Sequence, residues 1–167
     1  MPIYHSPSRN LRDLKIHGPR LKITIGHPIL NHVGGRSLVS GQSRLTETDA
    51  LIDTGAQRTV LSPEAVERIG LPKVNETELR VVGTIVKADV YVASLQFPRC
   101  GLGAIDVMEV SCCELPHPRY RCLIGRDVLS RWVFTYDGPA GIWQIKEDAG
   151  LGWVEPPEGF DPNLWGE

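Results

Sequence analysis

The chain has 167 residues, a length that suits one domain with a real hydrophobic core. Hydrophobic residues make up 41% of it and charged residues 23%, which is typical of a folded globular protein and excludes the disordered and fibrous classes. The formal net charge is only −2 and the basic residues are scattered, so neither nucleic acid nor an anionic membrane is an expected partner. Because the sequence has no apolar signal core and no apolar run long enough to cross a bilayer, we expect a cytoplasmic location.

The metal-binding residue types do not follow a ligand pattern. Four cysteines lie in one stretch of the chain: Cys100, Cys112, Cys113 and Cys122. They lack paired C-x-x-C spacing, so we expect reduced, mostly buried thiols rather than a zinc site. His27 and His32 lie in a segment with proline and glycine that does not place them on one helical face. The sequence therefore predicts no metal and no cofactor.

The first half of the chain begins with an irregular segment and continues with strands. Residues 1–20 mix Pro, Ser, Arg and Asn without a sustained period, which is typical of an arm that is ordered only when something holds it. Polar and apolar residues then alternate from Arg20 to Ile25, which predicts a half-buried strand. The apolar run 50–52 predicts a buried strand that stops at the turn Asp53-Thr54-Gly55-Ala56.

A short helix and a hairpin follow this turn. Ser62 and Pro63 suit the N-cap and first residue of a helix, so we expect one or two turns from residue 64 to 69, closed by Gly70. From residue 78 to 97 Val, Ile, Thr and Tyr dominate, and Gly83 interrupts them. This pattern predicts two strands joined at a tight tip.

The last third of the chain predicts further short strands. We expect strands at 104–110 and 121–124, a brief helix opening at residues 125–127, and a final hairpin whose strands lie at 132–136 and 142–145. Beyond residue 147 the pattern ends, and the tail carries three aromatic residues: Trp153, Phe160 and Trp165. We therefore divide the chain into an N-terminal arm (1–20), a β-rich domain (21–147) and a C-terminal tail (148–167), which is either a docking strap or disordered.

The turn at Asp53 carries the candidate chemistry. An aspartate on a rigid turn can catalyse peptide hydrolysis when a second carboxylate lies close enough for the pair to share one proton. One carboxylate then takes a proton from a water, and the other protonates the departing amide nitrogen. Gly55 permits a sharp turn, and the Thr54 hydroxyl can tie neighbouring turns together. Asp-Thr-Gly is also a common turn sequence, so this interpretation needs support from the rest of the chain.

That support comes from two blocks in a fixed order. The segment from Ala50 to Ser62 resembles the active-site segment of retroviral and retroviral-like aspartic proteases, the retropepsins. The segment from Cys122 to Leu129 resembles the downstream apolar-apolar-Gly-Arg block, which in that family threads beside the active-site loop and leads into a short helix. The hairpin at Gly83 takes the place of the family's flap, which closes over bound peptide. The resemblance implies an all-β fold, a retropepsin-like closed acid-protease barrel with one or two short helices.

The resemblance also implies an activity. It predicts an aspartic endopeptidase without metal or cofactor, in which Asp53 is catalytic and Thr54 and Gly55 support the active-site loop. The residues that it places against a substrate are Ala56, Gln57, Arg58, Val82, Gly83 and Thr84. Only Asp53 is followed by Thr-Gly, so the catalytic pair requires a homodimer whose two-fold axis brings the same turn of each copy together. The expected partners are thus a second copy of the chain and a peptide or protein substrate.

Two departures from the family leave questions open. Gln57 stands where retroviral members commonly carry an aspartate that pairs with the arginine of the downstream block, so Arg126 needs another partner, either Asp127 or a carboxylate across the dimer. The hairpin tip also lacks the multiple glycines of viral flaps. The alternatives are a retropepsin-like dimerisation or peptide-binding module without activity, and a ligand-binding β-barrel whose aspartate turn is structural. Either terminal segment can supply the dimer interface.

Overall fold

A computed structural model describes residues 3–5, 11–28, 44–81, 83–98, 100–115 and 117–147. The strands are β1 (Ile3–His5), β2 (Arg20–Gly26), β3 (Thr46–Ile52), β4 (Val60–Leu61), β5 (Lys73–Val81), β6 (Thr84–Gln96), β7 (Ile105–Cys112), β8 (Cys122–Ile124), β9 (Trp132–Asp137) and β10 (Ile142–Glu147). The helices are α1 (Leu11–His17), α2 (Pro63–Ile69) and α3 (Arg126–Leu129).

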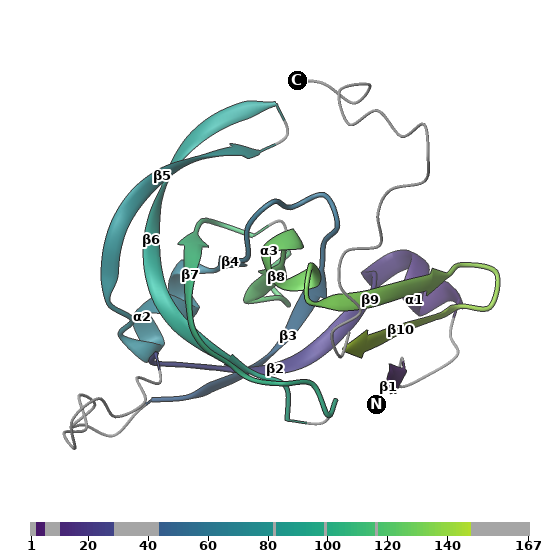
Figure 1. The fold of residues 1–167 in the computed structure, drawn as a ribbon. Helices are drawn as coiled ribbons and strands as arrows, with labels where there is room; N and C mark the ends of the chain where they lie inside the picture. The colour runs from purple at the N-terminus through teal and green to yellow at the C-terminus, as the bar shows by residue number, and fades with distance from the viewer. Residues whose placement is uncertain are drawn as a thin grey trace, which may run out of the picture.

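The strands lie in two sheets (Figure 1). The larger sheet has seven strands in the order β2-β3-β8-β4-β7-β6-β5, and β2 also pairs with β6, so the hydrogen bonding returns on itself. The smaller sheet has three strands in the order β1-β10-β9. The all-β, retropepsin-like class expected from the sequence is confirmed, although the two sheets do not form one simple barrel.

Alternating strands and one capped helix build the core. Leu21, Ile23 and Ile25 of β2 are fully buried, because their strand alternates between the core and the surface as its sequence predicted. The predicted helix at residue 64 is α2: the Ser62 hydroxyl accepts a hydrogen bond from the Ala65 amide at 3.3 Å. Gly70 ends it with a φ of 75°, a left-handed conformation that glycine adopts without strain.

Part of the N-terminal segment packs on the same core. Leu14 of α1 is buried, and the Tyr120 hydroxyl donates to the His17 carbonyl at 2.8 Å. Strand β1 pairs antiparallel with β10, with Tyr4 opposite Ile145. The aromatic residues of the C-terminal tail, on which the sequence left two interpretations, lie outside the described residues. No helix in the described part of the chain is long and apolar enough to cross a membrane.

Candidate active site

Asp53 stands at the end of a central strand. Strand β3 pairs antiparallel with β2 on one side and parallel with β8 on the other, so its last residue has little freedom to move. The Asp53 amide donates to the Ile124 carbonyl of β8 at 3.0 Å. The buried strand predicted from the run 50–52 therefore delivers the aspartate to a fixed place, as a catalytic carboxylate requires.

The turn itself orients the carboxylate. The Gly55 amide donates to Asp53 Oδ1 at 2.8 Å, and the Ala56 amide donates to the Asp53 carbonyl at 3.2 Å. Asp53 is half-buried while Thr54 and Gly55 are exposed, so the turn faces out of the single chain. Oδ2 accepts no hydrogen bond from the residues that the structure describes. One oxygen is thus held and the other is open to water or to a second acidic group.

Helix α3 lies beside this loop and binds its backbone. The Arg126 amide donates to the Ala56 carbonyl at 2.9 Å, and the Asp127 amide donates to the Gln57 carbonyl at 3.3 Å. The Arg126 side chain reaches the Thr54 carbonyl through Nη1 at 3.4 Å. These contacts satisfy three carbonyls of the loop that carries Asp53, as the threading of the downstream block implied.

Of the two partners suggested for Arg126, the first, Asp127, was wrong. Asp127 does not pair with Arg126; its carboxylate accepts from the Thr59 amide at 2.8 Å through Oδ2 and from the Thr59 hydroxyl at 2.7 Å through Oδ1. A carboxylate on α3 therefore binds the far end of the loop. The position taken in retroviral members by a loop aspartate is here the exposed Gln57. The alternative, a carboxylate across the dimer, stays a prediction.

Gly125 permits the close crossing of the two segments. A Cβ at this position would lie 2.5 Å from the backbone carbon of Arg58 and 2.6 Å from its oxygen, which no side chain can occupy. The Gly125 amide donates to the Thr59 hydroxyl at 3.2 Å. Position 125 thus requires glycine, because its backbone lies too close to the backbone of Arg58 for a side chain to fit between them.

The hairpin expected to act as a flap is present. Strands β5 and β6 pair up to Val81 opposite Thr84, and Gly83 at the tip has a φ of 80°. The hairpin arches on the side of the molecule where the β3–β4 loop lies (Figure 1). Gly83 and Thr84 are exposed, whereas Val82 lies outside the described residues. The structure thus places two of the three predicted tip residues at the surface of the hairpin, and contact with a substrate stays a prediction.

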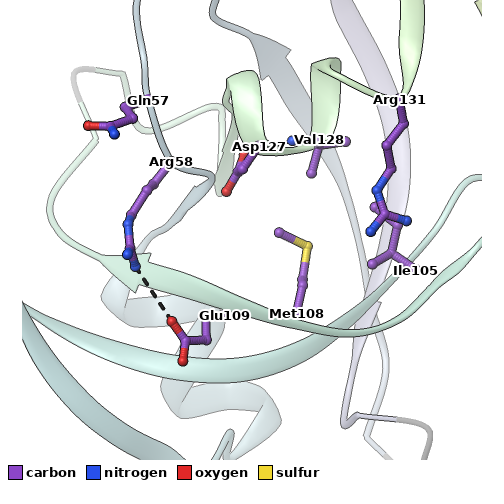
Figure 2. Close-up of a pocket in the computed structure, with 8 residues that line it drawn as sticks. All are labelled: Gln57, Arg58, Ile105, Met108, Glu109, Asp127, Val128 and Arg131. Carbon is purple, nitrogen blue, oxygen red and sulfur yellow. Dashed lines mark hydrogen bonds and ion pairs between the residues drawn. The ribbon is translucent and has the colours of Figure 1, made fainter. Parts of the chain in front are cut away.

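A pocket of about 380 Å³ lies between the β3–β4 loop, strand β7 and helix α3 (Figure 2). It is lined by Gln57, Arg58, Ile105, Met108, Glu109, Asp127, Val128 and Arg131. Arg58 Nη1 lies 3.6 Å from Glu109 Oε2 of β7, so this predicted substrate-binding residue already has an acidic neighbour. Asp53, Thr54 and Gly55 do not line the pocket, so it is separate from the turn that carries the candidate catalytic carboxylate.

The four cysteines lie in the part of the chain that the structure describes. Cys100 and Cys122 are buried, as expected, whereas Cys112 and Cys113 are half-buried; none of the four forms a disulfide. Burial raises the pKa of Cys112 to about 11, so this thiol is protonated at neutral pH. Within the described residues, no group of three or more His, Cys, Asp or Glu side chains could hold a metal ion.

Sequence reasoning missed two residues of this site. Thr59 and Asp127 are 68 residues apart, and neither was singled out as a supporting residue. The available signal was the place of Asp127 directly after the Gly-Arg pair. The sequence did not show that Thr59 would lie next to Asp127.

These features define a retropepsin-like aspartic protease: an all-β fold, an Asp-Thr-Gly turn at the end of a core strand, and a glycine-dependent crossing beside it. Residues 40–131 match the family described as "gag-polyprotein putative aspartyl protease", which is more than half of the chain. The chain belongs to this family.

Several solved structures resemble the chain, among them two proteases. The protease of EIAV in complex with the inhibitor HBY-793 has 22% identity and a TM-score of 0.40, with 51% of this chain and 76% of that chain covered. A retropepsin-like aspartic protease from Rickettsia conorii has 17% identity and a TM-score of 0.48, with 86% of this chain and 90% of that chain covered. No curated protein matches the chain.

Proposed function

We propose that the chain is an aspartic endopeptidase that hydrolyses peptide bonds with a water activated by two Asp53 carboxylates, one from each subunit of a homodimer. The observation that carries the proposal is the setting of Asp53. It follows a core strand, its Oδ1 is held by the Gly55 amide at 2.8 Å, and its Oδ2 is free of hydrogen bonds with the described residues. A single chain supplies one such carboxylate, so a second copy completes the pair.

The chemistry follows from bringing two carboxylates together. Like charges at short distance do not both ionise, so the pair holds one shared proton. The ionised member takes a proton from the water as it attacks the substrate carbonyl, and the protonated member donates to the departing nitrogen. The exposed Thr54 hydroxyl can bond to the partner's turn and fix the distance between the two aspartates.

The substrate is a peptide or protein segment held between the loop and the hairpin. Ala56, Gln57 and Arg58 continue the backbone from Asp53, and the predicted tip residues are Val82, Gly83 and Thr84. Closure of the hairpin would exclude water from the reacting carbonyl. The proposal includes a cytoplasmic location and requires neither metal, nucleic acid nor membrane as a partner.

The test compares cleavage of a mixed peptide library by the wild type, by Asp53→Asn and by Asp106→Asn. Assays from about pH 3 to pH 8 span the titration of carboxyl groups. Asp106 is an exposed aspartate on β7, so its variant is a matched control for the loss of one negative charge. We expect Asp53→Asn to lose about 10²- to 10⁴-fold in rate, and Asp106→Asn to keep the wild-type rate. Equal cleavage by all three proteins, or cleavage by none, would contradict the catalytic proposal.

The same proteins separate catalysis from binding alone. A module that only binds peptides would retain a labelled peptide equally well in the wild type and in Asp53→Asn, measured by fluorescence anisotropy, with no product formed. A peptidase would bind peptide in both proteins and release product only in the wild type. A metal chelator should leave the wild-type rate unchanged.

A further inference from the structure

The pocket between the β3–β4 loop, β7 and α3 has an apolar floor. Ile105 and Val128 are buried in the core, and Met108 packs against the same core. Figure 2 shows the Met108 side chain pointing into the space between β7 and α3. A volume of about 380 Å³ is at the small end of the range for ligand sites, so the pocket suits one large side chain rather than an extended segment.

Charged and amide side chains form the rim around this floor. The rim residues are Gln57, Arg58, Glu109, Asp127 and Arg131. Figure 2 shows Arg58 and Arg131 on opposite sides of the pocket, with Met108 between them. An apolar floor with a few polar groups beside it is the usual composition of a small-ligand site. A ligand that fits therefore has an apolar part and at least one charged or hydrogen-bonding part.

Both acidic side chains of the rim already have donors. Asp127 accepts from the Thr59 amide and hydroxyl and, through Oδ1, from the Val128 amide at 2.9 Å. Glu109 Oε2 lies 3.6 Å from Arg58 Nη1. The side chains of Glu109 and Arg58 are 59% and 43% exposed, so water screens their attraction and the pair can open to a ligand. A cationic ligand would have to compete with all of these donors.

Arg131 is the rim charge without such a partner. Its side chain is exposed and makes no ion pair or hydrogen bond with the residues that the structure describes. A guanidinium binds a carboxylate through two parallel N–H···O bonds, which gives both affinity and orientation. The free hydrogen-bonding capacity of the rim is therefore that of an anion-binding group next to an apolar surface.

The opposite side of the rim suits a peptide group. Gln57 is exposed, and its amide both donates and accepts hydrogen bonds, as the C=O and N–H of a peptide require. Arg58 and Glu109 offer a further donor and acceptor once their 3.6 Å pair opens. A peptide group on this side, an apolar side chain on the floor and a carboxylate at Arg131 are the three parts of a C-terminal residue.

We propose that this pocket binds the C-terminal residue of a peptide or protein chain, with the carboxylate on Arg131 and an aliphatic or aromatic side chain on the floor around Met108. The site is distinct from the candidate catalytic turn, because residues 53–55 do not line it. The inference goes beyond the proposed function and does not rest on it. A chain without peptidase activity would bind the same ligand.

Peptide binding tests the chemistry of the ligand. Fluorescence anisotropy compares three fluorescein-labelled tetrapeptides: one that ends in leucine with a free carboxylate, the same peptide as a C-terminal amide, and one that ends in glycine with a free carboxylate. The Asp53→Asn protein is measured beside the wild type, since it leaves a cleavable probe intact. We expect the first peptide to bind at least about tenfold more tightly than the others, because the amide lacks the charge for Arg131 and glycine lacks the apolar side chain. Equal affinities, or no binding of the first peptide, overturn the proposal.

Variants at position 131 locate the carboxylate. Arg131→Gln should weaken binding of the leucine peptide by about tenfold or more, to the affinity of its amide. Arg131→Lys should have an intermediate effect, because it keeps the charge and loses the two-pronged geometry. Arg68→Gln removes an exposed arginine from α2, so it is the matched control and should bind like the wild type. Circular dichroism checks that the variants fold. Wild-type affinity in Arg131→Gln would show that the carboxylate is held elsewhere and that the proposal is wrong.

A methyl signal reports directly on the floor of the pocket. Met108 is one of two methionines in the chain, so ¹³C-methyl labelling of methionine gives few NMR signals, and the Met108→Leu variant identifies the one that matters. In the wild type, N-acetyl-leucine should shift this signal in a saturable way, and N-acetyl-leucinamide should bind at least about tenfold more weakly. This measurement needs no change at position 131. A signal that N-acetyl-leucine leaves unchanged overturns the proposal.

The results separate the pocket from the proposed activity. Arg131-dependent binding of the leucine peptide by a protein that cleaves no peptide supports the pocket and contradicts the proposed function. Peptidase activity that disappears in Asp53→Asn, but without Arg131-dependent binding, supports the function and overturns the pocket.

Discussion

Asp127 and Thr59 are joined by two hydrogen bonds across 68 residues of sequence: the Thr59 amide donates to Oδ2 at 2.8 Å, and the Thr59 hydroxyl donates to Oδ1 at 2.7 Å. Thr59 is fully buried. The pair closes the loop that begins at Asp53, because Thr59 ends the loop and Asp127 stands on the helix that binds its carbonyls. The geometry of the candidate catalytic turn therefore depends on a contact between two residues that lie outside the Asp53-Thr54-Gly55 turn.

The first prediction concerns this carboxylate. Asp127→Asn replaces one of the two acceptor oxygens by an NH2 donor, so the Thr59 amide and hydroxyl can no longer both donate to this side chain. We therefore expect a loss of about 1 to 3 kcal/mol in the free energy of unfolding, measured in urea. The exposed control Asp106→Asn should change it by less than about 0.5 kcal/mol. Equal unfolding midpoints for the wild type and Asp127→Asn contradict the proposed role.

A double-mutant cycle shows whether the loss comes from this contact. Thr59→Val keeps the volume of the side chain and removes its hydroxyl, while Thr59→Ser keeps the hydroxyl. We expect Thr59→Val and Asp127→Asn to show a coupling of about 0.5 to 3 kcal/mol, and Thr59→Ser to retain the contact. Additive effects would place the stabilisation elsewhere in α3.

The second prediction concerns the crossing at Gly125. Gly125→Ala would put a Cβ 2.5 Å from the Arg58 backbone, so either the loop or α3 must move. We expect a loss of about 1 to 3 kcal/mol in the free energy of unfolding and, if the peptidase proposal is correct, a large loss of activity. Gly138→Ala is the control, because its Cβ would meet only the Tyr136 side chain at 3.4 Å, an ordinary contact. If Gly125→Ala and Gly138→Ala have the same unfolding free energy and the same peptidase activity, the close contact between Gly125 and the Arg58 backbone does not matter for stability or activity.

The parts of this fold that follow from neighbouring residues could be predicted, and those that depend on distant contacts could not. Helix α2 lies where Ser62, Pro63 and Gly70 predict it, because capping acts within one turn of the helix. The strands at Asp53 and around Gly83 follow from a short apolar run, from β-branched residues and from turn residues, although β3 and β5 begin earlier than predicted, at Thr46 and Lys73. The resemblance to retropepsins supplied the order of these elements.

The N-terminal helix was missed for a physical reason. Of the seven residues of α1, only Leu14 is buried. The sequence therefore lacks the repeated apolar residues, three or four positions apart, by which an amphipathic helix is recognised. Its helical state depends on packing against residues far away in sequence. The bond between Asp127 and Thr59 could not be predicted for the same reason, since only the completed sheet brings the two residues together.

The third prediction tests how far α1 contributes to the domain. Leu14 is buried in the core, so Leu14→Ala should lower the free energy of unfolding by about 2 to 5 kcal/mol. Leu11→Ala should change it little, because Leu11 is 55% exposed on the same helix. Chemical denaturation of both variants measures the two unfolding free energies. A negligible effect of Leu14→Ala would mean that residues 11–17 are an appendage.

The last prediction is a pH dependence from Cys112. Burial raises its pKa to about 11, above the value of a thiol in the unfolded chain. Because the folded state holds this proton more tightly, its contribution to stability is complete below about pH 9 and is lost as the pH rises towards 11. Cys112→Ala should remove the part of the fall in stability that comes from this thiol. The difference between the unfolding free energies of the wild type and the variant should therefore narrow between about pH 9 and pH 11.

Alkylation provides an independent measurement of the same thiol. The thiolate is the species that reacts with iodoacetamide, and the raised pKa of about 11 lowers its population at neutral pH by about a hundredfold. Mass spectrometry should therefore find Cys112 modified far more slowly in the folded protein than in urea. Rapid modification of folded protein at neutral pH, together with an unchanged stability difference above pH 9, would show that the thiol of Cys112 is neither shielded nor held in its protonated form by the fold.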